Sequence, residues 1–155
     1  MSRSIGEEIK QTKPFGSLEQ EATLSIARTA AQLEHGLVEL FKPYGITPTQ
    51  YNVLRILRGA GEDGLCRFEV SDRLVAQVPD VTRLLDRLEQ MRLVARERDS
   101  ADRRLVTARI TQAGLALLAE LEGPTAEFHR RRLGHLGARQ LRTLIDLLAE
   151  ARTPR

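Results

Sequence analysis

Residues 78–91 have the sequence VPDVTRLLDRLEQM, and this stretch decides the fold. At about 100° per residue, a helix over these positions gathers its apolar side chains on one face. The opposite face offers hydrogen-bonding groups near the N-terminal end. Pro79 suits the first helical position, where no backbone N–H is needed. The pattern predicts an amphipathic helix over 79–91, whose inner face holds Val81, Leu84, Leu85, Leu88 and Met91 and whose outer face holds Pro79, Thr82, Arg83, Asp86 and Gln90.

The neighbouring segments extend this helix into a larger motif. A shorter helical run from Phe68 to Val75 precedes it across residues 76–78, and two helices joined by so short a turn form a helix-turn-helix. Two runs, 94–98 and 104–110, then flank the polar loop 99–103, and Val106, Ala108 and Ile110 alternate with other side chains. Alternation on either side of a polar loop predicts a β-hairpin. The combination predicts a winged helix, mostly α with a small β component (α+β).

The flanking segments predict further helices. Residues 1–16 are expected to be a flexible arm, and Ser17 and Gln20 form a capping-box pattern that starts a helix of roughly 25 residues. Thr47, Pro48 and Gln50 predict the start of a buried helix. Leu65 and Cys66 are expected to pair with the hairpin. Thr111 is expected to cap a C-terminal helix that kinks or breaks at Gly123-Pro124, and a last helix is expected at about 138–152.

We therefore divide the chain into an arm (1–16), an N-terminal dimerisation helix (17–46), a winged helix-turn-helix (47–111) and C-terminal dimerisation helices (112–155). The long terminal helices are amphipathic, and one chain has too little core to bury all their apolar faces. This predicts a homodimer. A two-fold dimer places two reading helices about 34 Å apart, which matches successive major grooves of a palindromic site.

Composition narrows the class of protein. The chain has 155 residues, a net charge of +3 and 41% hydrophobic residues, which fits one domain with an extension. No apolar run is long enough to cross a membrane, and residues 1–14 lack the apolar centre of a signal peptide, so we expect a cytoplasmic protein. Only three of the 24 basic residues are lysine. Arginine suits phosphate and guanine because its planar fork makes paired hydrogen bonds, although genome base composition is an alternative explanation.

Several motifs give no support to other functions. Residues 59–64 match G-x-G-x-x-G, but a predicted helix precedes them and two acids lie inside, so we interpret them as a glycine-rich helix end. Cys66 is the only cysteine, and we expect it to be inert rather than a redox switch. The three histidines are scattered. We therefore expect no metal, no cofactor and no enzymatic activity.

Four segments together resemble the MarR family of bacterial transcriptional regulators. They are residues 80–89 (DVTRLLDRLE), the Leu93-Val94 pair, residues 98–104 (RDSADRR) and residues 110–114 (ITQAG). The likeness extends over roughly residues 17–149, and Arg92 departs from it because the family usually has glycine there. The resemblance implies a homodimer that binds palindromic promoter DNA, often as a repressor released by a small phenolic ligand or by oxidation.

Both lines of reasoning name the same DNA-binding residues. The recognition helix 79–91 is expected to place Arg83 against guanine, and Asp80 against a cytosine amine or a neighbouring arginine. The wing 99–104 is expected to bring Arg103 or Arg104 to the minor groove or to phosphates, with Asp102 orienting one of them. Solvated surface charge is the alternative for each arginine. The predicted DNA-binding set is Gln77, Pro79, Asp80, Thr82, Arg83, Arg87, Asp102, Arg103 and Arg104.

A small aromatic effector would bind where the dimerisation helices meet the winged helix. This placement comes from the family resemblance and from general pocket location. The candidate lining is Leu33, Leu37, Tyr44, Tyr51 and Leu115, for which core packing is the alternative. A second hypothesis for the whole chain is a dimeric ligand-binding or protein-interaction module that does not read an operator.

Overall fold

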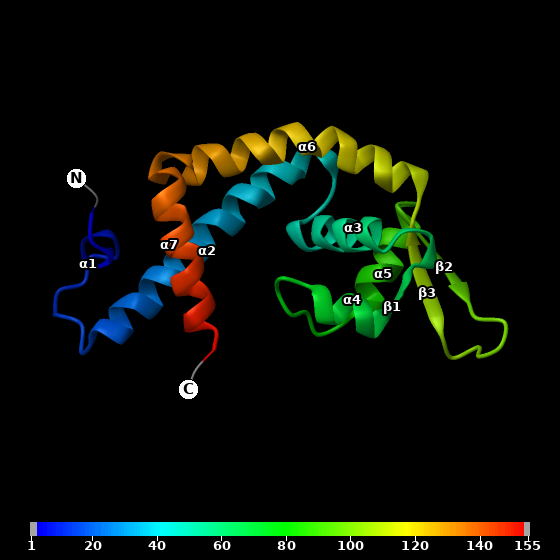
Figure 1. Ribbon diagram of the computed structural model, residues 1–155, viewed down its shortest axis with the longest axis horizontal. Helices are drawn as coiled ribbons and strands as arrows, with labels where there is room; N and C mark the ends of the chain where they lie inside the picture. Colours follow the sequence, from blue (N-terminus) through cyan, green and yellow to red (C-terminus); the bar gives the residue numbers. More distant parts are fainter. Residues whose placement is uncertain (1–2, 154–155) are drawn as a thin grey trace.

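The computed structural model describes residues 3–153 (Figure 1). Residues 1–2 of the predicted arm and 154–155 of the predicted C-terminal segment lie outside the described residues. The elements in chain order are α1 (Ile5–Glu8), α2 (Leu18–Phe41), the 3₁₀ helix η1 (Lys42–Tyr44), α3 (Pro48–Ala60), η2 (Gly61–Asp63), β1 (Leu65–Cys66), α4 (Arg67–Arg73), α5 (Val81–Gln90), β2 (Val94–Arg98), β3 (Val106–Ile110), α6 (Gln112–Leu133), η3 (Gly134–Leu136) and α7 (Gly137–Ala151).

Helix α3 is the central element of the core. It begins as predicted: the Thr47 hydroxyl accepts a hydrogen bond from the Gln50 N–H, and the Gln50 side chain accepts one from the Thr47 N–H. Pro48 occupies the first turn. Val53, Leu54 and Leu57 are fully buried and pack with residues from every element of the winged helix. At its C-terminal end Gly64 has a φ of +66° and lies so close to the Ala108 carbonyl that a Cβ would clash. The glycine-rich stretch therefore ends a helix and packs it on the sheet.

The two helices of the helix-turn-helix are present but shorter than predicted. Helix α4 covers Arg67–Arg73, and α5 covers Val81–Gln90, so the predicted ranges 68–75 and 79–91 are wrong at their edges. The start of α5 moves because the Asp80 carboxylate accepts a hydrogen bond from the Arg83 N–H at 2.9 Å. Asp80 is thus the N-cap and Pro79 lies outside the helix rather than at its first position. The inner face is as expected, with Leu85 and Leu88 buried.

The wing is a three-stranded antiparallel sheet in the order β1-β3-β2. Val94 pairs with Ile110 and Arg98 with Val106. Leu65 pairs with Ala108, which confirms the prediction that residues 65–66 join the hairpin. The side chain of Ala108, in the middle of β3, is buried in the core. The wing loop projects beyond the rest of the molecule (Figure 1).

Arg92, the departure from the family pattern, occupies a left-handed conformation with a φ of +60°. It lies between the end of α5 and β2, and its carbonyl accepts a hydrogen bond from the Thr111 hydroxyl at 2.8 Å. A side chain at this φ costs about 1–2 kcal/mol, whereas glycine there loses about 0.5–1 kcal/mol of chain entropy on folding. This position therefore favours glycine on balance.

We predict that Arg92→Gly raises the free energy of unfolding by about 0.5–1 kcal/mol. Urea denaturation of the two proteins measures the difference. Arg92→Ala is the matched control, because alanine also has a Cβ and keeps the strain. A glycine variant no more stable than the alanine variant contradicts this account of residue 92.

The terminal helices form the other half of the molecule. Helix α2 has 24 residues, close to the predicted length, and α7 lies within one residue of its predicted range. Ser17 caps α2 by accepting from the Gln20 N–H, but the Gln20 side chain accepts from the Gly16 N–H, so the predicted reciprocal box is only half formed. The arm contains the one-turn helix α1, and Glu8 forms an ion pair with Arg28 of α2 at 3.8 Å.

The sequence predicted a kink or a break at Gly123-Pro124, and the structure shows no break there. Helix α6 runs without interruption over 22 residues and arches across the top of the molecule (Figure 1). The Thr125 hydroxyl donates to the Leu121 carbonyl, one turn earlier, beside the position where proline supplies no N–H. The carbonyl that loses its donor to the proline is that of Glu120, and the helix continues past it while packed against α2 and α3.

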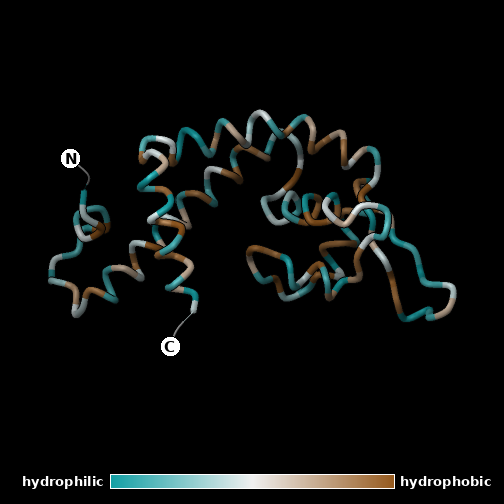
Figure 2. The backbone as a smooth tube through the Cα atoms, viewed as in Figure 1, coloured by the Kyte–Doolittle hydropathy of each residue, from teal (hydrophilic) through white to brown (hydrophobic). Residues whose placement is uncertain are grey.

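The outer parts of α2 and α7 bury little apolar surface. Phe41 is the one buried residue of α2, and no residue of α7 is buried. Exposed fractions reach 56% for Ile145 and 58% for Leu147. Apolar positions are visible along both helices in Figure 2. Among the described residues, no helix is both long and apolar enough to cross a membrane.

Candidate nucleic-acid interface

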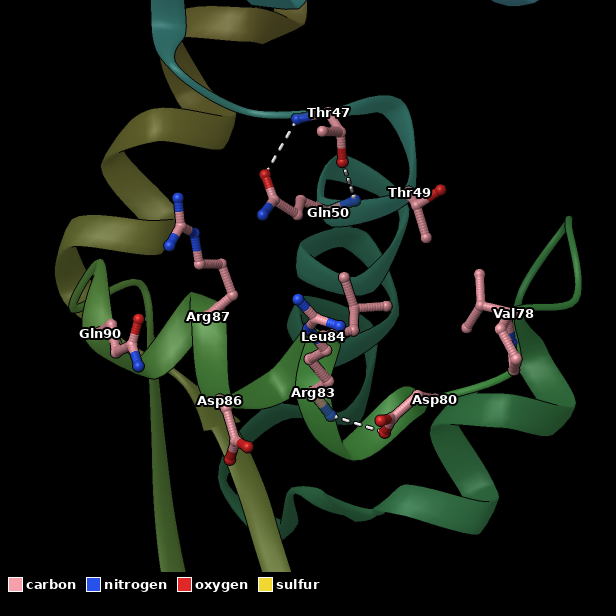
Figure 3. Close-up of a pocket in the computed structure, with 11 residues that line it drawn as sticks. Thr47, Thr49, Gln50, Val78, Asp80, Arg83, Leu84, Asp86, Arg87 and Gln90 are labelled. Atoms are coloured by element: carbon pink, nitrogen blue, oxygen red, sulfur yellow. Dashed lines mark hydrogen bonds between the residues drawn. The ribbon is translucent and has the colours of Figure 1, made fainter.

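The outer face of α5 carries the predicted reading residues. Arg83 and Arg87 are exposed and lie one turn apart, and Gln90 follows one turn later. Figure 3 shows that these side chains line an open hollow next to the N-terminal end of α3. Asp80 faces the same hollow, but its carboxylate already accepts from the Arg83 backbone. Its first role is therefore to cap the helix that presents Arg83.

The other wall of this hollow was missed by reasoning from sequence. It consists of Thr47, Thr49 and Gln50 at the start of α3. Their sequence signalled a helix cap, but nothing in that signal places the cap beside α5, more than 30 residues later. The two threonine hydroxyls add hydrogen-bonding groups to the arginine-bearing face.

A second set of contacts holds the turn and the first residues of α5. Arg67 donates a hydrogen bond to the Thr82 hydroxyl at 3.3 Å, and its guanidinium lies over the Phe68 ring. Asn52 of α3 accepts a hydrogen bond from the Val75 N–H at 2.9 Å. Gln77 and Pro79 are exposed on the same segment. The turn is thus fixed to α3, with its polar side chains free at the surface.

The wing loop is shaped by two aspartates acting on backbone. The Asp99 carboxylate accepts from the N–H groups of Ala101 and Asp102, at 2.7 and 3.0 Å. The Asp102 carboxylate accepts from the Arg104 N–H at 3.0 Å. Sequence reasoning expected Asp102 to orient an arginine side chain, but it holds Arg104 through its backbone. Arg103 and Arg104 are both exposed.

These backbone hydrogen bonds hold the pKa of the Asp99 carboxyl below its usual value. The lowered pKa means that Asp99 favours the ordered loop above pH 4, and that this contribution is lost as the pH falls through the folded-state value. We predict that the carboxyl of Asp99 titrates with a midpoint below that of an ordinary aspartate. Nuclear magnetic resonance should show the Ala101 and Asp102 amide shifts moving with the same midpoint. A midpoint at or above the usual value would mean that the loop is not held this way.

Some arginines of the chain form ion pairs with acidic side chains, whereas in the part of the chain that the structure describes the four predicted DNA-binding arginines do not. Arg28, Arg96, Arg109, Arg130 and Arg131 each pair with an acidic side chain. Within residues 3–153, no ion pair involves Arg83, Arg87, Arg103 or Arg104. The arginines on the outer face of α5 and in the wing loop, Arg83, Arg87, Arg103 and Arg104, therefore keep their charge available for an external anion.

Three of the five predicted effector residues pack against the core near the end of α2 and the start of α3, but the structure does not gather all five. Gly36, one turn from Leu33 on α2, lies against Phe128 and Arg132, whereas Leu115 is in the first turn of α6, far from Phe128 along the same helix. Leu37, Tyr44 and Tyr51 are partly buried against the core, and the Tyr51 ring packs on Phe41 with 4.5 Å between centroids. Leu33 and Leu115 are also half-buried. A hollow between α2 and α6 lies nearby and is lined by other residues, among them His35, Phe128 and Arg132.

A helix-turn-helix with an exposed arginine face, followed by a hairpin with two free arginines, defines a winged helix DNA-binding protein. A profile of the MarR family matches residues 44–105. A MarR transcription factor from Planctomyces limnophilus, known from a crystal structure, is 42% identical in sequence to this chain. The structural match covers 88% of this chain and 98% of that one, with a TM-score of 0.69. The chain belongs to the MarR family.

Two further relatives illustrate the range of similarity. The repressor MdtR of Bacillus subtilis is 30% identical over 102 residues, which cover 66% of this chain and 64% of MdtR. The chain spans about half to two thirds of the length of the curated relatives it matches. A MepR–DNA complex from S. aureus shares the fold at 20% identity, with a TM-score of 0.76 over 83% of this chain and 94% of that one.

The named relatives in this family are transcriptional regulators. The family and its relatives are regulators rather than enzymes. The mostly helical winged-helix architecture expected from sequence is confirmed.

Proposed function

We propose that this protein is a homodimeric repressor that binds a palindromic promoter site through α5 and the wing. The observation that carries the proposal is the set of exposed arginines without acidic partners on α5 and the wing loop. In the proposed complex Arg83 makes paired hydrogen bonds to guanine in the major groove. Gln77, Pro79 and Thr82 lie at the same groove with Asp80, and Arg87 contacts bases or the flanking phosphates. Arg103 and Arg104 enter the minor groove or contact phosphates.

The dimer follows from the uncovered apolar faces of the terminal helices. Leu141, Leu144, Ile145 and Leu148 recur along one face of α7, and none is buried within a single chain. We propose that the second copy covers this face together with exposed apolar residues of α2, such as Ile26. A two-fold axis through these helices gives the DNA two identical reading heads, which a palindrome matches.

Repression is the outcome we propose, since the curated relative MdtR is a repressor. A bound dimer at a promoter excludes polymerase from the same DNA. A bacterial regulator of this kind acts on the chromosome, which places it in the cytoplasm.

We also propose that a small aromatic effector weakens operator binding from the region of Leu37, Tyr44 and Tyr51; Leu33 and Leu115, the other two candidates, do not pack against the core together with them. The half-buried aromatic and aliphatic side chains there support an apolar ligand. Salicylate is a suitable first probe, and calorimetry with and without operator DNA tests the linkage. Equal affinity of salicylate for free and DNA-bound protein rejects it as an effector.

A gel-shift titration with the DNA flanking the protein's own gene tests the proposal as a whole. We expect binding that falls steeply with salt, because phosphate contacts release counterions. A random duplex of the same length is the control. Equal binding to both duplexes would favour the alternative, a dimeric interaction module that does not read an operator.

A further inference from the structure

Arg96 lies on β2 and faces the recognition helix. Its Nη2 donates to the Asp86 carboxylate and, at 3.1 Å, to the Glu89 carboxylate. Its backbone N–H donates to the other oxygen of Glu89, also at 3.1 Å. Both oxygens of Glu89 are thus used by one residue of the wing. Asp86 and Glu89 are one turn apart on α5, so a single arginine spans that turn.

Arg96 is the covered member of this arrangement, whereas its two carboxylate partners are partly open to water, with Asp86 48% and Glu89 42% exposed. The Arg96 side chain is 19% exposed, and its Nε is buried without a hydrogen-bond partner among the described residues. The hydrogen bond from Arg96 lowers the pKa of the Glu89 carboxyl. The Glu89 carboxyl is therefore ionised at neutral pH and stays paired with Arg96. The Arg96 guanidinium is the group that loses most hydration, so removing both carboxylates would leave a largely covered positive charge without a partner.

The other ion pair of the wing joins two strands of the sheet and does not involve α5. Arg109 on β3 pairs with Glu97 on β2 at 3.2 Å, within the sheet. Among residues 3–153, the contacts of Arg96 are the only ion pairs that join α5 to a wing strand. The ion pairs of one guanidinium group, that of Arg96, thus link the recognition helix to the wing sheet.

We propose that Arg96 is a positioning residue for DNA binding: it fixes the wing relative to the recognition helix so that both engage one duplex together. The inference rests on the proposed function. Arg96 itself touches no DNA, and Asp86 and Glu89 are occupied by it rather than offered to bases. A fixed wing adds its contacts to those of α5 at high effective concentration, whereas a loosened wing must be ordered on binding.

The test is a double-mutant cycle between Arg96→Gln and Arg103→Ala, measured by operator affinity. We expect Arg103→Ala to weaken binding about tenfold in the parent protein and less than about threefold in the Arg96→Gln protein. Arg109→Gln is the matched control, since it removes a wing ion pair without touching α5. In that background Arg103→Ala should keep its full effect.

Circular dichroism and denaturation show the fraction of each variant that is folded, and affinities refer to that fraction. Glu89→Gln is a second variant that keeps the side-chain shape and Arg96's contact with Asp86. It should reduce the effect of Arg103→Ala by an intermediate factor. A merely structural Arg96 would lower stability but leave the effect of Arg103→Ala unchanged.

The failures of the two proposals differ. A tenfold effect of Arg103→Ala that persists in Arg96→Gln overturns the positioning role and leaves the proposed wing contact intact. No effect of Arg103→Ala in the parent protein overturns the wing contact itself, and with it any role for Arg96 in placing that contact.

Discussion

Replacing Ile145 with glutamate is expected to split the dimer and to weaken operator binding by about 10²-fold or more. Ile145 is 56% exposed in the single chain, so the glutamate costs the isolated fold little. In the dimer the same position would be covered, and an unpaired carboxylate there loses its hydration. Losing the dimer removes the second reading head, which supplies the gain of bivalent binding.

Thr143→Glu provides the matched control. Thr143 lies on α7 opposite the apolar face and is exposed, so the same charge there should leave the dimer intact. Analytical ultracentrifugation measures the mass of both variants, and a gel-shift assay measures their affinity. A parent protein with the mass of one chain, or an Ile145→Glu variant that remains dimeric, would contradict the proposed interface.

Arg83→Ala is expected to cost about 1–3 kcal/mol of operator binding, which is roughly a fivefold to 150-fold loss. Arg83 is exposed on the outer face of α5, and its backbone is held by Asp80, so the fold does not depend on its guanidinium. A paired contact to one guanine carries sequence information, so the preference at that base pair should relax.

The pattern of loss distinguishes this role from a phosphate contact. Binding to random DNA should change little in Arg83→Ala, whereas Arg103→Ala should weaken all sequences more evenly and lower the salt dependence. Arg142→Ala, on the exposed surface of α7, is the control for the loss of one positive charge. Equal losses on operator and random DNA in Arg83→Ala would mean that Arg83 does not read a base.

Much of the architecture was predictable because local patterns and tertiary packing agree. The apolar period of residues 81–91 and the alternation of 106–110 each select one element, and the core confirms both. Where two local signals compete, prediction was weaker. Pro79 and Asp80 both suit the start of a helix, and the hydrogen bond from the Arg83 N–H decides for Asp80.

Contacts between residues that are far apart in the chain could not be predicted from the sequence. Pro124 would kink or break an isolated helix, but α6 continues through it while packed against α2 and α3. Thr49 belongs to a stretch that signalled only a helix start, although it lines the same hollow as Arg83 and Arg87. Arg96 had the sequence features of any strand arginine, and its two partners on α5 appear only in three dimensions.

The central claim is that two copies of this chain present their α5 helices to one duplex. A hydroxyl-radical footprint on the DNA flanking the gene tests it most directly. We predict two protected half-sites with a common sequence in inverted order, their centres about one helical turn, roughly 10 base pairs, apart. Protection of a single half-site, or uniform protection without sequence preference, would contradict the claim.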